Sequence, residues 1–280
     1  MKIESTILSR IAERVRVEVD RHMAETPLTD MQARLTDAPP VRSFHAALQS
    51  GFALITEIKQ RSPSMGEMRA ENVADAAHAY AECDLVKAVS VLTNASDFGM
   101  HIERLSEVRA VVQKPVLRKD FIIDTYQIYQ ARAYGADAVL LMTQLLSESD
   151  LQKFIDLIHE LGMDALMECR SPEDIAKVPT GTRVFGINSR DFLDKGDRFE
   201  QSLANQKIST GASDFTTDLT AFDNISLLPV DSIKVAESGI SPETIISVRD
   251  KGYNAALIGT DLLMNPRGIR AALASYRAVL

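Results

Sequence analysis

The 280-residue chain has no tryptophan, only two cysteines (Cys83 and Cys169), and no apolar run of the roughly 20 residues that a membrane-spanning helix needs. Two cysteines cannot build a disulfide framework, and they suit a reducing cytoplasm, where we expect this protein to be found. The start of the chain does not resemble a signal peptide, because charges interrupt an apolar stripe from Ile3 to Val15 that is typical of one helix face. We therefore expect no membrane segment.

Motifs for nucleotides and metals are also missing. The sequence contains neither G-x-G-x-x-G nor a P-loop, so a nucleotide cofactor is unsupported. The five histidines form no i, i+4 pair and no cluster with cysteine, so we predict no metal and no cofactor. The formal net charge of −8 argues against nucleic-acid binding, but it does not exclude an anionic small substrate, because local charge decides that.

What the sequence does contain is a regular alternation. Eight short apolar runs follow one another with helix-like stretches between them, and 45% hydrophobic residues supply a sizeable core. Eight strand–helix repeats predict an α/β protein with a single (β/α)8 barrel, the TIM-barrel fold. The predicted strands cover residues 52–59, 87–93, 115–119, 136–143, 163–168, 183–188, 232–238 and 254–260.

Residues 1–50 precede the first predicted strand, and we interpret them as an N-terminal helical extension of a catalytic barrel domain at 51–280. The pattern predicts a long amphipathic helix to about Ala24, a break at Pro27, a second short helix and a turn at Pro39–Pro40. We expect the extension to close one end of the barrel. The alternative is that it also helps to shape the substrate pocket.

A barrel of this kind gathers the carboxyl ends of its strands around one mouth, where active sites lie. Lys59, Lys119, Glu168, Asn188 and Glu237 stand at such strand ends, so we expect them to converge. Each alone could be an ordinary solvated strand end, but together they favour a site. A lysine held near carboxylates in a partly dry pocket can serve as a general acid, and a nearby glutamate can take up a proton.

Neighbouring positions add to this group. Glu57 lies two positions before Lys59, so both side chains point to the same face of the strand. Cys169 follows Glu168 and should therefore point outward into the helix layer as a packing residue. We also expect a positive mouth on this acidic protein, made by Lys59, Arg61, Arg118, Lys119 and Arg190.

The last two strands carry an anion-binding pattern. Gly239 follows the seventh strand, and Gly259 and Thr260 close the eighth. Short glycine-containing loops at these positions, with a short helix behind them at 261–264, form the common phosphate site of this fold. The alternative is that Gly239 and Gly259 only make tight turns.

The interval between the sixth and seventh strands is unusually long, from Asn188 to Glu237, and its middle part at 193–213 is polar. We interpret it as an inserted loop at the catalytic face. It is either a lid or a surface insertion without a role.

Several segments match one known family. They are EIKQRSPSMG at 57–66, SVLT at 90–93, PVLRKDFIIDTYQIYQARAYGADAVLLM at 115–142, HELGMDALMEC at 159–169, GINSRDF at 186–192, AESGI at 236–240 and ALIGTDLL at 256–263. Through them the chain resembles the indole-3-glycerol phosphate synthase family over nearly its whole length. RKDFI and S-P-S are the most specific parts of this resemblance.

The resemblance implies a decarboxylating lyase of tryptophan biosynthesis. Its substrate, 1-(2-carboxyphenylamino)-1-deoxyribulose 5-phosphate, loses CO2 and water to give indole-3-glycerol phosphate, with no cofactor and no metal. By the family pattern Lys119 is a general acid, and Lys59 is a second acid or a partner of the substrate carboxylate. Glu168 and Glu57 act as base or as electrostatic partners of the developing cation. The substrate is positioned by Asn188, Arg190, Glu237 and Ser238, and the substrate and phosphate pocket includes Ser62, Phe98, Gly239, Gly259 and Thr260.

The chain departs from the family pattern at three places, which are residues 85–88, 97–99 and 193–213. The family usually has Gly-Ala where this chain has Leu-Val-Lys-Ala, and two aromatic residues before a later glycine where this chain has Asp97, Phe98 and Gly99. These changes spare the proposed catalytic residues. The alternatives are a divergent phosphosugar-binding barrel enzyme and a non-catalytic paralogue. We expect a phosphorylated small molecule as ligand, and a monomer or weak homodimer.

Overall fold

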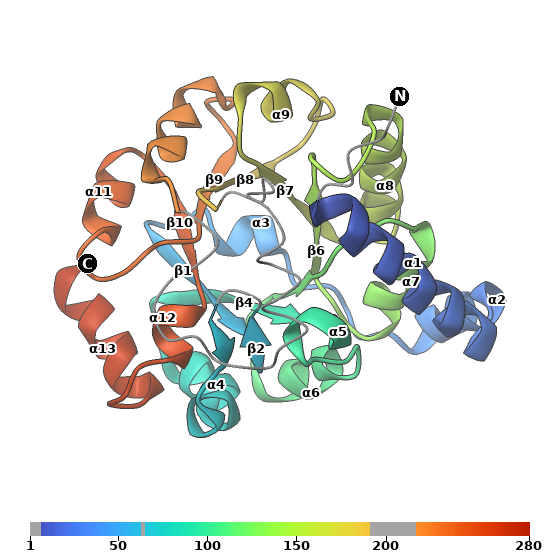
Figure 1. The fold of residues 1–280 in the computed structure, drawn as a ribbon, viewed down its shortest axis with the longest axis horizontal. Coiled ribbons are helices and arrows are strands. Elements are labelled where there is room, and N and C mark those ends of the chain that lie inside the picture. Colours follow the sequence, from blue (N-terminus) through green and yellow to red (C-terminus); the bar gives the residue numbers. More distant parts are fainter. Residues whose placement is uncertain (1–6, 63–64, 191–216) are drawn as a thin grey trace.

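Eight parallel strands close into a barrel in the order in which they occur along the chain, and helices surround them (Figure 1). The computed structural model describes residues 7–62, 65–190 and 217–280. The strands are β1 (Ala53–Ile58), β4 (Val86–Leu92), β5 (Val116–Lys119), β6 (Ala138–Met142), β7 (Asp164–Cys169), β8 (Val184–Asn188), β9 (Ile233–Glu237) and β10 (Ala255–Ile258). Because β10 pairs with β1 and every predicted strand is present, the predicted (β/α)8 fold is confirmed.

Helices follow the strands much as the periodicity predicts. They are α4 (Ala70–Glu82), α6 (Arg104–Val111), α7 (Thr125–Ala133), α8 (Glu148–Glu160), α9 (Pro172–Ala176), α11 (Ile245–Asp250), α12 (Thr260–Leu263) and α13 (Ile269–Val279). The described residues before β9 form the 3-10 helix η2 (Leu219–Leu227). The sequence analysis missed η2, and it also missed the hairpin of β2 (Arg61–Ser62) and β3 (Gly66–Glu67) and the short helix α5 (Ala95–Phe98).

Local side-chain chemistry sets the ends of these helices. Asp124 accepts a hydrogen bond from the backbone N–H of Tyr126, and Gln127 accepts one from the backbone of Asp124, so α7 begins with a capping box. Gly135 and Gly162 follow α7 and α8 with φ angles of +86° and +77°, a conformation that glycine adopts without strain. α7 and α8 therefore end just before these glycines, and the next strands begin at Ala138 and Asp164.

The strands are buried on both faces, which produces two apolar layers. Outward-facing side chains pack against the helices, and inward-facing ones fill the barrel. Cys169 lies in the outer layer, as predicted, and burial raises the pKa of its thiol. Full burial of one aliphatic side chain stabilises the fold by roughly 1.5–3 kcal/mol. The inner layer includes Ile55, Ala88, Leu117, Leu140, Leu166, Val184, Val235 and Leu257.

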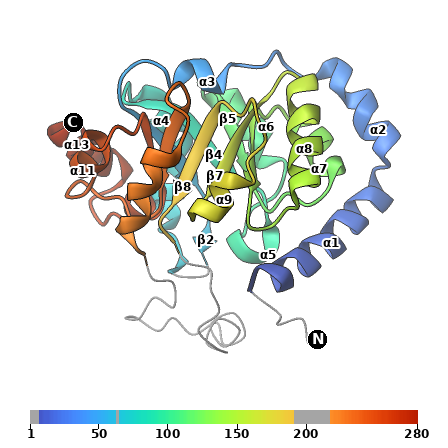
Figure 2. The same ribbon diagram turned by 90° about the horizontal axis from the view of Figure 1, so that it is seen from above.

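The chain before β1 forms α1 (Ile7–Glu25), α2 (Leu28–Ala33), the 3-10 helix η1 (Arg34–Asp37) and α3 (Phe44–Ala47). α3 lies at the end of the barrel opposite to β2 and α5, and α1 runs along one flank (Figure 2). Phe44 and Leu48 are completely buried in the inner layer, and the backbone N–H of His45 donates to Asp164 at the start of β7 (3.0 Å). The prediction that this region closes one end of the barrel is confirmed for α3.

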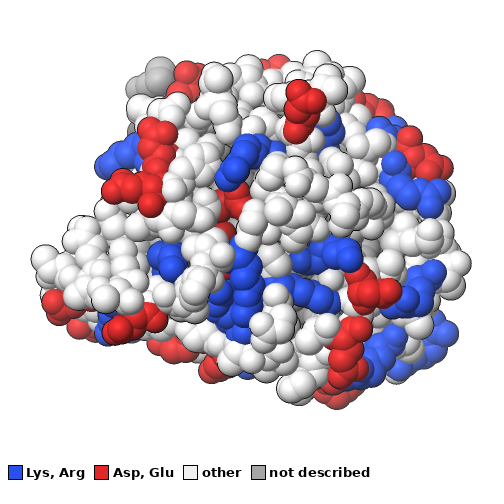
Figure 3. Space-filling view, turned by 180° about the vertical axis from the view of Figure 1, so that it is seen from behind, with Lys and Arg blue, Asp and Glu red and all other residues white. Residues whose placement is uncertain are grey.

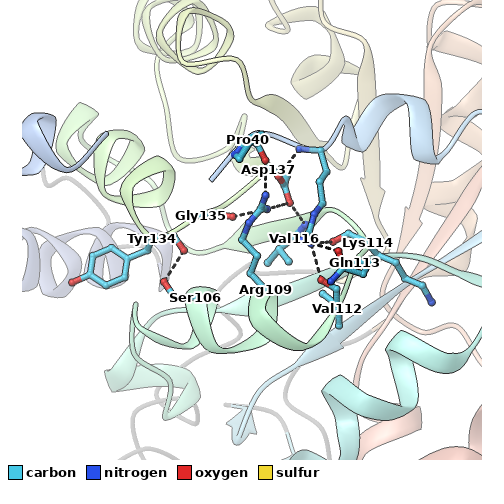
Figure 4. Close-up of polar contacts among 11 residues, drawn as sticks. Pro40, Ser106, Arg109, Val112, Gln113, Lys114, Val116, Tyr134, Gly135 and Asp137 are labelled. Carbon is cyan, nitrogen blue, oxygen red and sulfur yellow. Dashed lines mark hydrogen bonds and ion pairs between the residues drawn. The ribbon is translucent and has the colours of Figure 1, made fainter. Parts of the chain in front are cut away.

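A buried ionic network anchors the segment before α3 (Figure 4). Asp137, which is fully buried at the start of β6, accepts hydrogen bonds from the Arg109 guanidinium and from the backbone N–H groups of Arg42 (2.7 Å) and Val116 (2.8 Å). Arg109 also donates to the carbonyl of Pro40 (2.6 Å). The Pro39–Pro40 turn is thereby held against the amino ends of β5 and β6. Removal of one member of a buried pair of this kind costs about 3–5 kcal/mol.

The face seen from behind carries basic side chains across its middle, with acidic side chains among and around them (Figure 3). Within the three described ranges, no helix combines the length and the apolar character that crossing a membrane requires.

Candidate active site

A cavity of about 550 Å³ opens at the carboxyl ends of the barrel strands. Its lining includes all but one of the residues that the sequence analysis proposed for the site. They are Glu57, Lys59, Phe98, Lys119, Glu168, Asn188, Arg190, Glu237, Ser238, Gly239, Gly259 and Thr260. The predicted convergence of strand ends is therefore observed for this group.

Ser62 is the exception. It lies in the hairpin strand β2, is 3% exposed, and accepts a hydrogen bond from the backbone N–H of Met65 (3.2 Å), but it does not line the cavity. Residues 63 and 64 of the S-P-S segment lie outside the described residues, as does the proposed insertion at 193–213.

Lys119 lies between carboxylates. Its ammonium nitrogen is 3.1 Å from an oxygen of Glu168 on β7 and 3.5 Å from an oxygen of Glu237 on β9. Burial alone would lower the pKa of Lys119, but Glu168, Glu237 and Glu57 together raise the pKa above its usual value. Lys119 is therefore held as an ammonium group at neutral pH.

Glu57 and Lys59 share one face of β1, as their spacing predicts, and form an ion pair of 2.6 Å. Both side chains are almost fully buried. Burial would raise the pKa of Glu57, but the charges of Lys59 and Lys119 and the hydrogen bond from Lys59 lower it. Glu57 is therefore ionised in the resting protein.

Glu237 is in a different state. It is 1% exposed, and neither carboxylate oxygen has a hydrogen-bond partner among the described residues. Burial raises the pKa of Glu237 to about 8, with a further contribution from Glu168 and an opposing one from Lys119. The cavity therefore holds an ionised carboxylate and a carboxyl group that binds a proton close to neutral pH, and such a pair is typical of acid–base sites.

The expected positive mouth is only partly correct. Lys59, Lys119 and Arg190 line the cavity, but Arg118 does not. Arg118 is 3% exposed and points away from the cavity, because successive strand residues face opposite sides. Its guanidinium pairs with Asp120 (2.9 Å) and donates to Thr93 (3.0 Å). The ion pair between Arg118 and Asp120 therefore fixes the backbone on both sides of Lys119.

Arg61, the remaining member of the expected positive mouth, is also absent from the cavity wall. Its guanidinium donates to the backbone carbonyls of Ala95 (3.0 Å) and Ser96 (2.7 Å) in α5. It thus ties the β2 hairpin to the loop that carries Phe98.

One wall of the cavity is apolar. Phe98 and Phe121 stack with their ring centroids 6.1 Å apart and an angle of 24° between the rings. Ile11 on α1 also lines the cavity, so the N-terminal region shapes the pocket as well as closing the barrel. The sequence analysis missed Ile11 and Phe121, although Phe121 follows Lys119 by two positions and so lies on the same side of the chain. The other apolar lining residues include Leu92, Leu140, Met142 and Leu257.

Asp97 was also missed as a lining residue. Its side chain is 2% exposed and forms an ion pair of 3.0 Å with Arg14 of α1, which links the extension to the altered loop. Burial raises the pKa of Asp97, and Arg14 opposes this effect. The sequence offered one indication of this role, because Asp97 lies in the 97–99 segment that differs from the family pattern.

The loops after β9 and β10 form the opposite part of the lining. Ser238 has a φ of +69°, which is uncommon for a residue with a side chain, and the hydroxyl of Ser189 donates to its carbonyl (3.0 Å). Gly239 has a φ of +66°, and a methyl group there would lie 2.3 Å from Thr217. Gly259 precedes α12, which begins at Thr260, one residue before the predicted start. Gly239 therefore makes a tight turn, and its backbone also lies at the cavity.

Two further polar residues complete the site. The side-chain oxygen of Asn188 accepts a hydrogen bond from the backbone N–H of Arg190 (2.9 Å), so the end of β8 is locally rigid. Burial lowers the pKa of Arg190, while Glu57 and Glu168 oppose this effect. Among the residues that the structure describes, no group of three or more His, Cys, Asp or Glu side chains is placed to hold a metal ion.

Comparison with known proteins agrees with this architecture. A family model described as indole-3-glycerol phosphate synthase matches residues 8–207. A protein of that name from Roseiflexus castenholzii is 37% identical over 276 residues, which cover 93% of this chain and 94% of the relative. Another from Bacteroides thetaiotaomicron is 34% identical over 268 residues, with 93% and 94% covered.

Solved structures with lower identity share the fold. The 3-hexulose-6-phosphate synthase of Salmonella typhimurium superposes with a TM-score of 0.57 at 14% identity, and the match covers 81% of this chain and 98% of that chain. At this identity the likeness concerns the barrel alone.

Proposed function

The chain belongs to the indole-3-glycerol phosphate synthase family, and we propose that it is a carbon–carbon carboxy-lyase that closes the indole ring in tryptophan biosynthesis. Its substrate is 1-(2-carboxyphenylamino)-1-deoxyribulose 5-phosphate. The ring carbon that bears the carboxylate bonds to the ketone carbon, the bond to the carboxylate breaks to release CO2, and the ketone oxygen leaves as water. The product is indole-3-glycerol phosphate.

The observation that carries this proposal is the position of the Lys119 ammonium group, 3.1 Å from Glu168 and 3.5 Å from Glu237 inside the cavity. Attack on a ketone places negative charge on its oxygen, and a positioned ammonium group stabilises that charge and protonates it. A developing alkoxide is a much stronger base than a lysine amine, so the raised pKa of Lys119 does not prevent the transfer. Lys119 is the general acid of ring closure.

Glu168 and Glu57 supply the complementary charge. Loss of the hydroxyl group as water leaves a cation that is shared with the ring nitrogen, and nearby carboxylates stabilise such a cation or take up its proton. Glu57 is paired with Lys59 (2.6 Å), so Lys59 has a fixed position from which to meet the substrate carboxylate or act as a second acid. Asn188, Arg190, Glu237 and Ser238 position the substrate.

The two ends of the substrate fit the two kinds of cavity wall. Phe98 and Phe121 form an apolar surface for the aryl ring. The loops that contain Gly239, Gly259 and Thr260 face the other part of the cavity and suit the phosphate group. Ser62, in the hairpin of β2 and β3, is a further proposed member of the substrate pocket.

Ring closure with loss of CO2 and water changes no oxidation state overall, so acid–base groups suffice, and we propose no metal and no cofactor. Residues 1–50 form an extension and residues 51–280 the catalytic domain, a division supported by the start of β1 at Ala53. Both cysteines are buried and unpaired, which supports a cytoplasmic enzyme. We propose a monomer or weak homodimer that acts on a phosphorylated small molecule.

The decisive experiment mixes the purified protein with the carboxyphenylamino-deoxyribulose phosphate and follows indole fluorescence. The expected result is turnover that persists in the presence of EDTA. Binding of the substrate without turnover would instead support a non-catalytic paralogue, and no binding by a folded protein would support a phosphosugar enzyme with another substrate.

A further inference from the structure

Two glycines in the barrel are not required by the backbone. Nine glycines of the described residues have φ angles between +66° and +100°, where other residues are strained. Gly186 and Gly259 are the described glycines that lie outside this region. At these two positions glycine is therefore explained by a lack of room for a side chain beside the α-carbon.

A carboxylate fills that space in both cases. A methyl group on Gly186 would lie 2.0 Å from an oxygen of Glu237, and one on Gly259 would lie 2.5 Å from an oxygen of Glu57. Ordinary van der Waals contact begins near 3.4 Å. Two of the buried glutamates that line the cavity, Glu57 and Glu237, thus each lie against a glycine of a neighbouring strand or strand end.

Register explains the contact at Gly186. Gly186 of β8 pairs with Val235 of β9, and Asn188 pairs with Glu237. Gly186 and Asn188 face the same side of β8, so the Glu237 side chain folds back from the level of Asn188 to the level of Gly186. Leu166 of β7 lies on the other side of the same space, 3.4 Å from the position of the absent methyl group.

We propose that Gly186 is a positioning residue, whose missing side chain leaves the space that sets the Glu237 carboxylate at its distance from Lys119. This inference rests on the proposed function and extends it to a residue that touches no reacting atom. The carboxylate of Glu237 forms an ion pair of 3.5 Å with Lys119, which is long for a hydrogen bond, so packing against Gly186 also helps to orient it.

A methyl group at position 186 would move Glu237 rather than unfold the barrel. The atom that it meets is the end of a flexible side chain, which can rotate away, whereas backbone could not. A misplacement of about 1 Å at an active site can lower the rate about 100-fold. We therefore expect Gly186→Ala to fold and to lose about 100-fold in kcat, because Glu237 positions the substrate for reaction beside the Lys119 ammonium group.

Glu237→Asp provides the rescue test. Its carboxylate is one methylene shorter and avoids the alanine methyl group, so the double variant should turn over at least as fast as Gly186→Ala alone. The pH profile of the double variant should also return toward that of Glu237→Asp. Gly259→Ala is the matched control, because its methyl group meets Glu57, and Glu237→Asp should not rescue it. A kcat of Gly186→Ala within twofold of wild type, or a double variant that shows the product of the two single losses, would overturn the proposal.

A second measurement does not depend on turnover. Gly186→Ala should lower Tm in the wild-type background and lower it by less than half as much in a Glu237→Ala background, where the methyl group meets no carboxylate. Equal decreases in the two backgrounds would refute the contact. If the two decreases differ as expected but the wild-type protein does not turn over the substrate, the proposed function is contradicted. The contact between position 186 and Glu237 is then still supported.

Discussion

Replacement of Lys119 by methionine tests the central ion cluster, because it removes the ammonium group and keeps most of the side-chain volume. Glu168 and Glu237 would then lie in the cavity without the cation that is 3.1 Å and 3.5 Å from them. Removal of one partner from a buried ion pair costs about 3–5 kcal/mol when the other charge stays ionised. At about 2 °C for each kcal/mol in a domain of this size, Tm should fall by about 6–10 °C at high pH.

The loss should depend on pH. Without Lys119 the folded-state pKa of Glu237 rises further, because the charge of Lys119 no longer opposes the effect of burial, while the pKa of Glu237 in the unfolded chain does not change. A carboxyl group whose folded-state pKa is raised destabilises the fold progressively as pH increases through that pKa. The decrease in Tm should therefore be large at pH 9 and much smaller at pH 6, where a proton replaces the missing cation.

The assays are scanning calorimetry at the two pH values and the indole fluorescence assay. Loss of the general acid should lower kcat at least about 100-fold at every pH. Lys153→Met on the exposed face of α8 is the matched control and should change neither property. Unchanged turnover would refute the role of Lys119 as the acid, and an equal decrease in Tm at pH 6 and pH 9 would refute the electrostatic account.

Other measurements test the remaining parts of the site. Wild-type stability should fall as pH rises from about 4.5 to about 8, because folded Glu237 keeps a proton that the unfolded chain has lost. This part of the dependence of Tm on pH should vanish in Glu237→Gln. An identical dependence in the variant would contradict the assignment of the raised pKa to Glu237. Arg118→Met should lower both Tm and kcat by leaving Asp120 buried without its cation, and a second change, Asp120→Asn, should restore part of the Tm; no change in either property would show that the pair does not hold the strand end. Phe98→Ala should raise KM about 10-fold with kcat within a few-fold, as loss of about 1.4 kcal/mol of ring contact requires, whereas an unchanged KM would place the aryl ring elsewhere. Inorganic sulfate at tens of millimolar, the concentration scale of a weak anion site, should compete with substrate, and its failure to do so would argue against the phosphate-binding loops.

Most of the fold follows from patterns that act over short distances. Each barrel strand is buried on both faces, so its residues form a continuous apolar run that ends where the chain reaches the cavity. In β7 this run ends at Glu168 and Cys169, and the period of two already assigns the carboxylate to the inside and the thiol to the outside. The ends of α7 and α8 can also be predicted from local sequence, because Gly135 and Gly162 mark them.

Arg118 shows where such patterns fail. Its position beside Lys119 suggested a place in the mouth, but the side chain points outward and is neutralised by Asp120. The alternation of side chains along the strand was sufficient to predict that Arg118 points outward. It could not predict that Arg118 forms a buried ion pair with Asp120. The contribution of Ile11 to the cavity was equally hidden, because nothing local to α1 says which part of a distant barrel it will contact.

The sequence by itself determined the barrel, the order of its strands and the set of strand ends that meet at the mouth, because these depend on periodicity and on one rule of topology. Only the tertiary structure decided the charge state of each carboxylate. Glu57 and Glu237 are both buried glutamates at strand ends, yet one lies 2.6 Å from Lys59 and is ionised, while the other lacks a hydrogen-bond partner among the described residues and holds its proton to a pH of about 8. The difference arises from distances between side chains of different strands, which no pattern within one strand contains.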